Sequence, residues 1–420
     1  MPMKLTRKEQ EMLNGTCGPG MQAAMEVVVK MGELYGAERL LPVRNAHIDA
    51  AAYTTIWEAG TDFLEYLVAC GARVAVPTTI NPVSRDIENW RNLGISEEFA
   101  MKSKRIEDAY LALGVIPTWT CAPYQSTNVP RFGEIVSWSE SNAVNYVNSV
   151  IGARAERLPD LMDVCCAVTG RVPAYGMYLD ENRKGELLFV LEGFDGSWFR
   201  DAVDYAVLGY HVGEIAVNRV PVIAGLPAGT TADQLKAFSA AAASGGAICL
   251  FHALGLTPEA TSLEAVCPDP RIVETHRVTP DDLRETRKRL DTAAGEHVDM
   301  VLLGCPHLSA DELGQLARLL QGQKVAAGTE LWLMTSDTQY QLARRAGNAQ
   351  ILEEAGALIT RDTCLMEIDE GNGRWRGKTL VTDSGKAAQY APAINGVRIH
   401  MAAMEGCVQA AVTGFIPGRR

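Results

Sequence analysis

The sequence has no apolar run of membrane-spanning length, although 47% of its 420 residues are hydrophobic. A transmembrane helix needs about 20 consecutive apolar residues. Basic runs are absent too, and the net charge is −12. Such a charge argues against nucleic acid or an anionic membrane as the main partner. The composition is that of a globular protein with a large core.

Several common site motifs are also missing. There is no Cys-x-x-Cys pair, no Gly-x-Gly-x-x-Gly dinucleotide fingerprint, no full P-loop and no Gly-x-Ser-x-Gly elbow. The N-terminus, MPMKLTRKEQEML, has no apolar signal region, and Thr6 and Glu9 are spaced as the capping box of a helix. Ten cysteines without such a signal indicate a reducing compartment, the cytoplasm.

Short apolar runs alternate with helical patterns along almost the whole chain. The strands include VDMVLLGCPH, TELWLMTSD and KTLVTDSGK, and the helices include residues 21–36, 96–114 and 310–322. This alternation predicts βαβ units and an α/β fold with mostly parallel sheets. The most polar stretch, residues 269–297, predicts mostly helix, and we place a possible subdomain boundary near residue 285.

Three cysteines stand where a strand-like run ends: Cys121 after LGVIPTWT, Cys305 after VDMVLLG and Cys364 after GALITRDT. In a parallel sheet the carboxyl ends of the strands open on one crevice, where ligands bind. Three thiolates there can hold an iron–sulfur cluster and leave one iron open to a substrate hydroxyl. The alternatives are that the cysteines are small buried hydrophobes, or that Cys305 and His307 bind zinc in a hydrolase.

Polar residues crowd the ends of other predicted strands, namely Asn45, His47, Thr78, Thr79, Asn81, Ser384, Gly385 and Lys386. Turns favour these residue types, but a crevice for a polar ligand needs them as well. The segment TDSGKAAQYAP is typical of an anion nest, in which a lysine and backbone amides face a carboxylate or phosphate. Glu140 and Asn142 follow soon after Cys121, and we expect them near the same crevice.

Nine segments, spread from about residue 4 to about residue 410, together resemble the aconitase X family: NAHID, VAVPTTINP, TCAPY, FGEIVSWSESNAV, GRVPAYGMYLDENR, LFHALGLTPEA, GCPHLS, DTC and TDSGKAAQYAP. The resemblance implies an aconitase-like core of several three-layer α/β units. It also implies a hydro-lyase with an iron centre held by three cysteines, which match Cys121, Cys305 and Cys364. Classical aconitases use a Cys-x-x-Cys pair that this chain lacks, so a [2Fe–2S], a [4Fe–4S] or a mononuclear centre stays open.

The resemblance further implies a partner. The family has a swivelling part that is expected to carry a catalytic serine base. About thirty residues follow the TDSGK segment, too few for such a domain. We therefore expect a large subunit that lacks the swivel domain and needs a separate small subunit to complete the site.

Two substrate classes occur in the family: archaeal members resemble phosphomevalonate dehydratases, and bacterial members resemble cis-3-hydroxy-L-proline dehydratases. Where the phosphate-handling branch tends to have Gly-Val-Ser, this chain has Ala50, Ala51 and Ala52, with Asn81 and Pro82 retained. The change removes a hydroxyl donor and a close backbone approach, which favours a substrate without phosphate. Cis-3-hydroxy-L-proline is therefore the expected substrate, and mevalonate 5-phosphate is the alternative.

The expected reaction eliminates water from a β-hydroxy carboxylate. We expect His47, Ser384 and Lys386 among the catalytic groups. Substrate would be bound by Asn45, Ala50, Ala51, Ala52, Thr78, Thr79, Asn81, Pro82, Glu140 and Asn142. A binding subunit without catalytic activity, whose cysteines are merely buried, is the remaining alternative.

Overall fold

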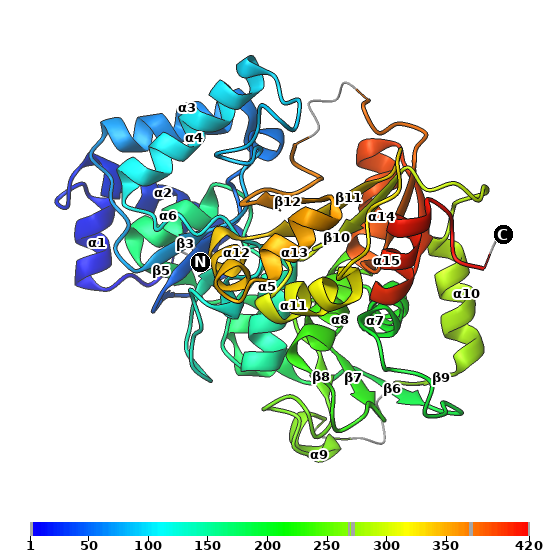
Figure 1. Ribbon diagram of the computed structural model, residues 1–420. Coiled ribbons are helices and arrows are strands. Elements are labelled where there is room, and N and C mark those ends of the chain that lie inside the picture. Colours follow the sequence, from blue (N-terminus) through cyan, green and yellow to red (C-terminus); the bar gives the residue numbers. More distant parts are fainter. Residues whose placement is uncertain (1–2, 268, 270–273, 369–372, 419–420) are drawn as a thin grey trace. The chain divides into compact units, whose positions relative to one another are not determined.

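The computed structural model describes residues 3–267, 269, 274–368 and 373–418 and divides into two compact units, Met1–Lys184 and Gly185–Arg420 (Figure 1). We call them unit 1 and unit 2 and describe each by itself. Both are mixed α/β structures whose sheets are mostly parallel, which confirms the predicted fold class.

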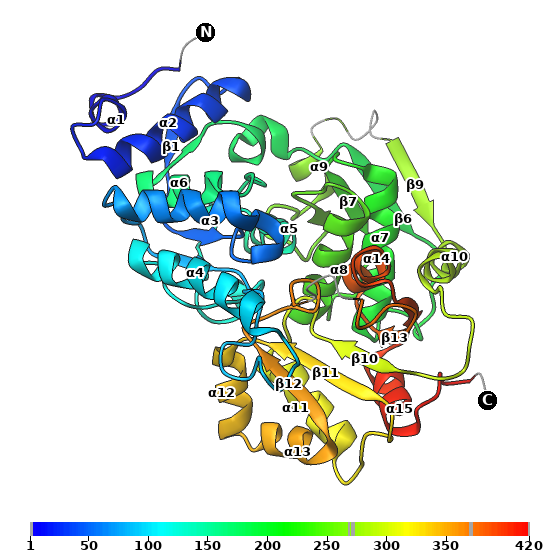
Figure 2. The same cartoon turned by 90° about the horizontal axis from the view of Figure 1, so that it is seen from above.

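Unit 1 is built on a parallel sheet with the strand order β3-β2-β4, formed by β2 (Ala46–Ile48), β3 (Thr78–Ile80) and β4 (Ser137–Trp138). A separate antiparallel pair joins β1 (Leu40–Pro42) to β5 (Arg171–Pro173). The α-helices are α1 (Arg7–Leu13), α2 (Pro19–Leu34), α3 (Tyr53–Ala69), α4 (Glu97–Leu113), α5 (Ser141–Tyr146) and α6 (Met162–Thr169). Helix α6 packs against β2, and α3 and α4 lie side by side (Figures 1 and 2).

Side-chain caps fix the starts of two of these helices where the sequence predicts them. Thr6 accepts a hydrogen bond from the Glu9 amide, and the Glu9 carboxylate accepts one from the Thr6 amide, which confirms the capping box of α1. Ser96 caps α4 by accepting from the Phe99 amide at 3.1 Å.

The run before Cys121 is not a strand, contrary to the prediction. Residues 115–120 run beside β3 without forming a ladder, although the Ile116 and Thr120 amides donate to carbonyls of β3. Two features interrupt the pairing: Pro117 has no N–H to donate, and Trp119 has a positive φ of 41°. Cys121 nevertheless follows a segment that is hydrogen-bonded along the sheet.

Unit 2 contains two parallel sheets. The first has the order β8-β7-β6-β9, with β6 (Leu187–Leu191), β7 (Pro221–Ala224), β8 (His252–Ala253) and β9 (Glu274–Val278). The second has the order β12-β11-β10-β13-β14, with β10 (Met300–Leu303), β11 (Glu330–Thr335), β12 (Ala357–Arg361), β13 (Thr379–Thr382) and β14 (Arg398–Met401). The α-helices are α7 (Ala202–Ala216), α8 (Ala232–Gly245), α9 (Leu263–Val266), α10 (Pro280–Leu290), α11 (Ala310–Leu320), α12 (Asp337–Arg345), α13 (Asn348–Ala355), α14 (Gly385–Asn395) and α15 (Met404–Thr413).

The polar stretch 269–297 is less helical than predicted. Its residues 270–273 lie outside the described part of the chain, Glu274–Val278 form strand β9, and α10 follows. Strand β9 is hard to recognise in the sequence because it carries charged residues. Glu274 and Arg277 are exposed on it, and the strand pairs with β6 alone. Residue 285 lies inside α10, and the subdomain boundary placed near it stays a prediction.

The five-stranded sheet has an apolar layer on each face. Val301, Leu303, Leu331 and Leu333 pack against α11, α13 and α15 in one buried cluster. Figure 2 shows these helices on one side of the sheet and α14 on the other. Because strand residues alternate between faces, the buried Leu302 and Trp332 point away from that cluster. Burial on both faces explains the continuous apolar sequence of β10 and β11.

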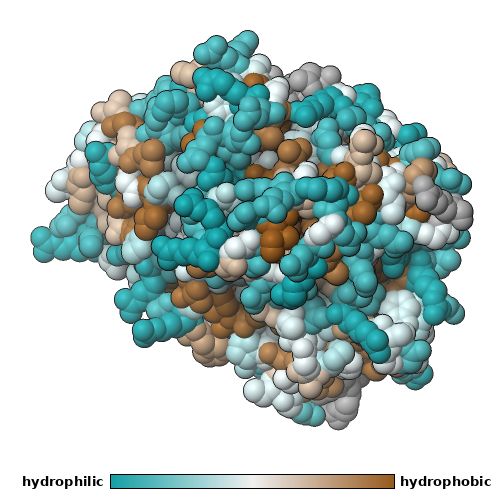
Figure 3. Space-filling model, in the orientation of Figure 1, coloured by the Kyte–Doolittle hydropathy of each residue, from teal (hydrophilic) through white to brown (hydrophobic). Residues whose placement is uncertain are grey.

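Hydrophilic side chains predominate on the face shown in Figure 3, and apolar residues lie between them in smaller groups. Within the described ranges, no helix is both long and apolar enough to cross a membrane.

Gly304 ends β10 at a place where only glycine fits. Its φ is +109°, and a Cβ there would lie 2.2 Å from the carbonyl oxygen of Met334 on the neighbouring strand. Gly322 offers a matched comparison, since it also has a positive φ, +74°, but open space around a Cβ.

We expect Gly304→Ala to lower the free energy of unfolding by about 3 kcal/mol or more, since it adds a steric clash to backbone strain. Gly322→Ala adds the strain alone and should cost about 1 kcal/mol. Urea unfolding followed by tryptophan fluorescence measures both. Equal effects of the two substitutions would show that the close approach to Met334 does not exist.

Candidate active site

The five-stranded sheet of unit 2 has a topological switch point at β10. The chain runs from β10 to β11 and β12 on one side and then crosses to β13 and β14 on the other. In open parallel sheets, ligands bind beyond the carboxyl ends of the two strands that flank such a reversal. Those strands are β10 and β13, and they are followed by Cys305 and by the Ser384-Gly385-Lys386 segment, respectively.

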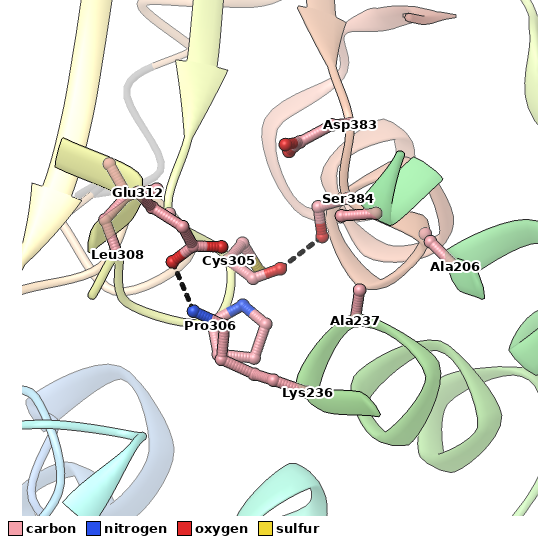
Figure 4. Close-up of a pocket in the computed structure, with 12 residues that line it drawn as sticks. Ala206, Lys236, Ala237, Cys305, Pro306, Leu308, Glu312, Asp383 and Ser384 are labelled. Carbon is pink, nitrogen blue, oxygen red and sulfur yellow. Dashed lines mark hydrogen bonds and ion pairs between the residues drawn. The ribbon is translucent and has the colours of Figure 1, made fainter. Parts of the chain in front are cut away.

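The two loops at the switch point touch each other. The Ser384 hydroxyl donates a hydrogen bond to the Cys305 carbonyl and accepts one from the Ala387 amide at 3.0 Å, so it caps α14 (Figure 4). A cavity of about 20 Å³ between the loops is lined by Cys305, Asp383 and Ser384 among others. Such a cavity holds about one water molecule. The structure therefore brings the predicted Cys305 and Ser384 together.

A buried ionic network borders the same cavity. The ammonium of Lys236, from α8, pairs with Glu312 of α11 and lies 3.0 Å from Asp233 (Figure 4). It also donates a hydrogen bond of 3.3 Å to the carbonyl of His307. Glu312 accepts a hydrogen bond from the Ser309 amide at 2.8 Å. Acidic partners raise the pKa of Lys236 even though burial opposes its charge, so the lysine is cationic.

Asp383 lines the cavity beside this network. Burial, followed by repulsion from Glu312, raises the pKa of Asp383 to about 7, while the Lys236 ammonium opposes the shift. Its side chain keeps some exposure to solvent. A carboxyl group that titrates near neutral pH can exchange a proton within the site.

His307 joins the loop of Cys305 to the loop of Cys364. The imidazole is buried, and its Nε2 lies 2.8 Å from the carbonyl oxygen of Thr363, the residue before Cys364. A carbonyl oxygen only accepts, so Nε2 carries the proton and has no lone pair for a metal. Nε2 of His307 is therefore not available as a zinc ligand, which weakens the predicted alternative of a zinc site at Cys305 and His307.

The carboxyl ends of the strands in unit 1 form a second polar cluster. His47 of β2 lies with Nδ1 2.8 Å from the Thr79 hydroxyl and with Nε2 3.4 Å from the Asn81 amide oxygen. The Asn81 amide nitrogen donates to Asp49, which fixes the oxygen of that amide toward His47. Nε2 is therefore the protonated nitrogen, and Nδ1 accepts from Thr79.

His47 is neutral in this setting. Complete burial lowers its pKa to about 4, although Asn81 and the charge of Glu140 act in the opposite direction. A neutral imidazole with both nitrogens hydrogen-bonded orients Asn81 and Thr79, the two predicted binding residues beside it.

Ala50, Ala51 and Ala52 are buried and do not form an open surface. The Asp163 carboxylate of α6 accepts from the Asp49 amide at 2.7 Å, from the Ala50 amide at 3.4 Å and from the Ser139 hydroxyl at 2.8 Å. Burial, and then the charge of Asp160, raises the pKa of Asp163 to about 6 despite these donors. A carboxylate of the protein thus occupies the turn after β2.

Glu140 and Asn142 hold the segment that carries Cys121. Glu140 caps α5 by accepting from the Ala143 amide at 2.6 Å, and it also accepts from the Asn142 side chain at 2.9 Å. The Asn142 amide nitrogen donates to the Cys121 carbonyl at 2.7 Å, and the Asn142 amide oxygen accepts from Tyr124 at 2.7 Å. The structure therefore places this helix beside the segment of Cys121, and the position of Glu140 and Asn142 at a ligand crevice stays a prediction.

Of the remaining predicted residues, Asn45 and Thr78 lie at the amino ends of their strands, whereas Pro82 and Lys386 follow the carboxyl ends. Asn45 precedes β2, at the amino end of the strand, where it accepts from the Trp138 indole at 2.8 Å. Thr78 begins β3, and its hydroxyl donates to the Val76 carbonyl. Pro82 is buried just beyond β3. Lys386 is half-buried in the first turn of α14, at the switch point.

Three sequence profiles match the chain: the aconitase X first domain over residues 2–181, the second domain over residues 186–288 and the third domain over residues 298–413. The chain belongs to the aconitase X family. A crystal structure of Thermococcus kodakaraensis aconitase X in its holo form superposes with a TM-score of 0.87 at 34% identity, covering 97% of this chain and 100% of that one.

Curated aconitase X relatives carry two names. A cis-3-hydroxy-L-proline dehydratase of Pseudomonas aeruginosa is 39% identical over 99% of this chain and 71% of its own length. A phosphomevalonate dehydratase large subunit of Methanothermobacter thermautotrophicus is 40% identical over 94% of this chain and 95% of its own. Both are dehydratases, so this aconitase X is a hydro-lyase, as predicted.

The three predicted metal ligands differ from the four buried cysteines, although Cys17, Cys70 and Cys249 are also exposed or partly exposed. Cys121, Cys305 and Cys364 are partly exposed beside the sheet edges, Cys121 in unit 1 and the other two in unit 2. Burial raises the pKa of Cys165, Cys166, Cys267 and Cys407, which disfavours the thiolate that a metal binds. Within the described residues, no three His, Cys, Asp or Glu side chains are arranged to hold a metal ion, so joint ligation stays a prediction.

Sequence reasoning missed the buried charges of both units. Asp163 lies in the apolar run DLMDVCCAVTG, and Lys236 lies in the small-residue helix ADQLKAFSAAAASG. A charged residue among apolar or small residues on a helix is the signal that points to such groups, because an isolated buried charge is costly. Asp383 lies in the TDSGK segment, where Ser384 and Lys386, but not Asp383, are predicted to be catalytic.

As the pH drops from 6.5 toward 4, we expect His47 to lower the stability of this aconitase X, because His47 binds a proton in the unfolded chain before it does so in the folded one. The raised pKa values of Asp163 and Asp383 act in the opposite direction over the same window. The contribution of His47 is about 3 kcal/mol, present in full above this window and lost through it. Compared with wild type, His47→Gln should therefore lose less stability, or gain more, as the pH falls from 6.5 to 4. His297→Gln, at an exposed histidine, is the control. Identical pH profiles for wild type and His47→Gln would contradict this.

Proposed function

We propose that this aconitase X dehydrates a β-hydroxy carboxylate that has no phosphate group, cis-3-hydroxy-L-proline, to Δ1-pyrroline-2-carboxylate. The observation that supports this choice is the turn between β2 and α3, where four backbone amides already donate to groups inside unit 1. This turn is the place where the phosphate-handling branch tends to have Gly-Val-Ser.

The amides of this turn have partners within the protein. Asp49 and Ala50 donate to the Asp163 carboxylate, the Ala51 amide donates to the Asp49 carbonyl at 2.6 Å, and the Tyr53 amide donates to the Ser84 hydroxyl at 2.8 Å. A phosphate at a helix N-terminus needs such amides to point at the ligand. The Asp163 carboxylate also repels a second anion, and alanine at position 52 supplies no hydroxyl. These features support a substrate without phosphate.

We place the substrate carboxylate at the switch point of unit 2, beside Lys386. Lys386 stands in the first turn of α14, where the helix dipole and the ammonium both favour an anion. The Ser384 hydroxyl is held by the Cys305 carbonyl and the Ala387 amide, so we assign it to orienting this turn rather than to proton transfer.

The reaction removes a proton from Cα and the hydroxyl group from Cβ. The electron pair of the broken Cα–H bond forms the double bond, and the resulting enamine tautomerises to the cyclic imine. Asp383, whose pKa is about 7, is the group of this chain at the switch point that can hand a proton to the departing hydroxyl. His47 acts in this scheme through Asn81, whose amide it orients, since a buried imidazole with a pKa of about 4 is a weak base.

The partly exposed Cys121, Cys305 and Cys364 are thiols of the type that iron–sulfur centres need. When bound there, an iron centre, whether [2Fe–2S], [4Fe–4S] or mononuclear, supplies Lewis-acid polarisation of the substrate hydroxyl. The Thermococcus kodakaraensis aconitase X structure is that of a holo form, which is consistent with a cofactor in this family.

A small swivel-domain subunit completes the proposed enzyme in the cytoplasm. The chain matches 95% of the Methanothermobacter large subunit but 71% of the Pseudomonas aeruginosa dehydratase. The remaining length of the Pseudomonas aeruginosa protein has no counterpart in these 420 residues. We propose that a separate polypeptide supplies that part, with the catalytic serine as general base, because the Methanothermobacter relative is named a large subunit.

With the small subunit present and the centre reconstituted without oxygen, we expect turnover of cis-3-hydroxy-L-proline, detected by trapping the imine with o-aminobenzaldehyde. Mevalonate 5-phosphate should give a kcat/KM at least about 100-fold lower, because its phosphate lacks donors at the β2–α3 turn. The large subunit alone should also lose at least about 100-fold in rate, since it lacks the base. A preference for mevalonate 5-phosphate would overturn the substrate assignment. Full activity of the isolated chain would show that it needs no partner subunit.

Cysteine substitution tests the three ligands. Cys121→Ser, Cys305→Ser and Cys364→Ser should each lose most of the iron found per chain by mass spectrometry, together with the visible charge-transfer absorption. Cys70→Ser is the matched control, because Cys70 is also partly exposed but lies at the end of α3. Wild-type iron content in any one of the three variants would exclude that cysteine as a ligand.

A further inference from the structure

We propose that Lys236 is the positioning residue that holds the Cys305 loop in place, so that it determines how readily this thiol is presented to the metal centre. The proposal rests on the proposed role of Cys305 as a ligand. Its structural part, the restraint of the loop by Lys236, can be tested in the protein without metal.

Lys236 reaches the loop from a different layer of unit 2. It belongs to α8, which follows β7 of the four-stranded sheet, whereas Cys305 follows β10 of the five-stranded sheet. Figure 4 shows its side chain running beside Pro306 to Glu312. Through its bond to the His307 carbonyl, Lys236 connects the two layers at the residues that carry the thiol.

The neighbouring contacts hold each end of this loop. Ser384 donates to the Cys305 carbonyl, and the Ser309 hydroxyl donates to Asp233 at 2.9 Å. Between these points, the main chain of His307 is held by Lys236, and its ring is held by the Thr363 carbonyl. Loss of the ammonium therefore removes one restraint on the middle of the loop, the bond to the His307 main chain, while the His307 ring and the Leu308 main chain keep theirs.

The burial of this lysine makes a purely stabilising role a poor explanation. Lys236 is 3% exposed, and its partner Glu312 is 8% exposed. Removing two charges from water costs several kcal/mol per ion, and an apolar pair of similar size is often as stable or more stable. A buried ion pair that borders a ligand crevice is a candidate for function, and here the groups it holds are those around Cys305.

The experiment compares Lys236→Met with the double variant Lys236→Met/Glu312→Gln, whose glutamine oxygen can still accept from the Ser309 amide. The single variant leaves Glu312 buried and unpaired, so its melting temperature should fall. The double variant removes that unpaired charge and should recover most of the melting temperature. Both variants lack the hydrogen bond to the His307 carbonyl, so neither should restore the loop.

The readout is the rate of iodoacetamide alkylation of Cys305 in the metal-free chain, followed by peptide mass spectrometry, with Cys121 as the reference in the same sample. We expect this rate to rise at least about 5-fold in both variants, because local opening exposes the thiol. After anaerobic reconstitution, iron per chain should fall in both. Arg85→Met is the matched control: it breaks the buried Arg85–Glu107 pair of unit 1 and should lower the melting temperature without changing the Cys305 rate.

Two results would overturn the proposal: wild-type alkylation of Cys305 in Lys236→Met, or recovery of the Cys305 rate together with the melting temperature in the double variant. Either result would mean that Lys236 only stabilises the fold and does not position the Cys305 loop. If alkylation of Cys305 rises but iron content stays unchanged, Lys236 holds the loop without determining how the thiol is presented to the metal centre, and this part of the proposal is wrong. The iron content of Cys305→Ser then decides separately whether Cys305 is a ligand. Loss of iron in both variants, together with faster alkylation of Cys305, supports both the role of Lys236 in holding the loop and the role of Cys305 as a ligand.

Discussion

The position of β10 in the middle of its sheet determines how unit 2 can act. Parallel pairing with β11 on one side and β13 on the other places the ends of these strands at one edge. The chain reaches β13 only after it has completed β11 and β12, so the loops that meet beside Cys305 come from residues about eighty positions apart. The hydrogen bond from Ser384 to the Cys305 carbonyl exists because of this crossing, and the cavity beside it follows.

Unit 1 repeats this arrangement on a smaller scale. Its central strand is β2, and the chain visits β3 on one side before it returns to β4 on the other. The polar groups that follow these strands form a connected cluster of Asp49, Asn81, His47 and Ser139 around the buried Asp163. In both units a buried ionisable side chain on a packed helix reaches the end of the central strand, Asp163 in one and Lys236 in the other. Such groups are costly to bury, and each is satisfied by several hydrogen bonds.

Much of this arrangement could be predicted from the sequence. The alternation of strands and helices, the capping box at Thr6 and the N-cap at Ser96 are local patterns, and the structure contains them. The grouping of Cys305 with Ser384 follows from the rule for strand ends in parallel sheets. Failures came where tertiary contacts replaced a local pattern. Residues 115–120 have the pattern of a strand but do not form a ladder, and the charged Glu274–Val278 became strand β9 because β6 offered it an edge. The partners of Lys236 and Asp163 are far away in the chain, so no local pattern could identify them.

The turn occupied by Asp163 also bears on how substrate preference can change during evolution. The amides of Asp49 and Ala50 can serve the protein's own carboxylate or an external anion, but not both at once. A serine gained at position 52 would enter a site that is 3% exposed, while the competing carboxylate remained in place. Under the proposed role of this turn in substrate choice, the effect of a mutation there depends on the residue at position 163 in α6, because the same amides are involved.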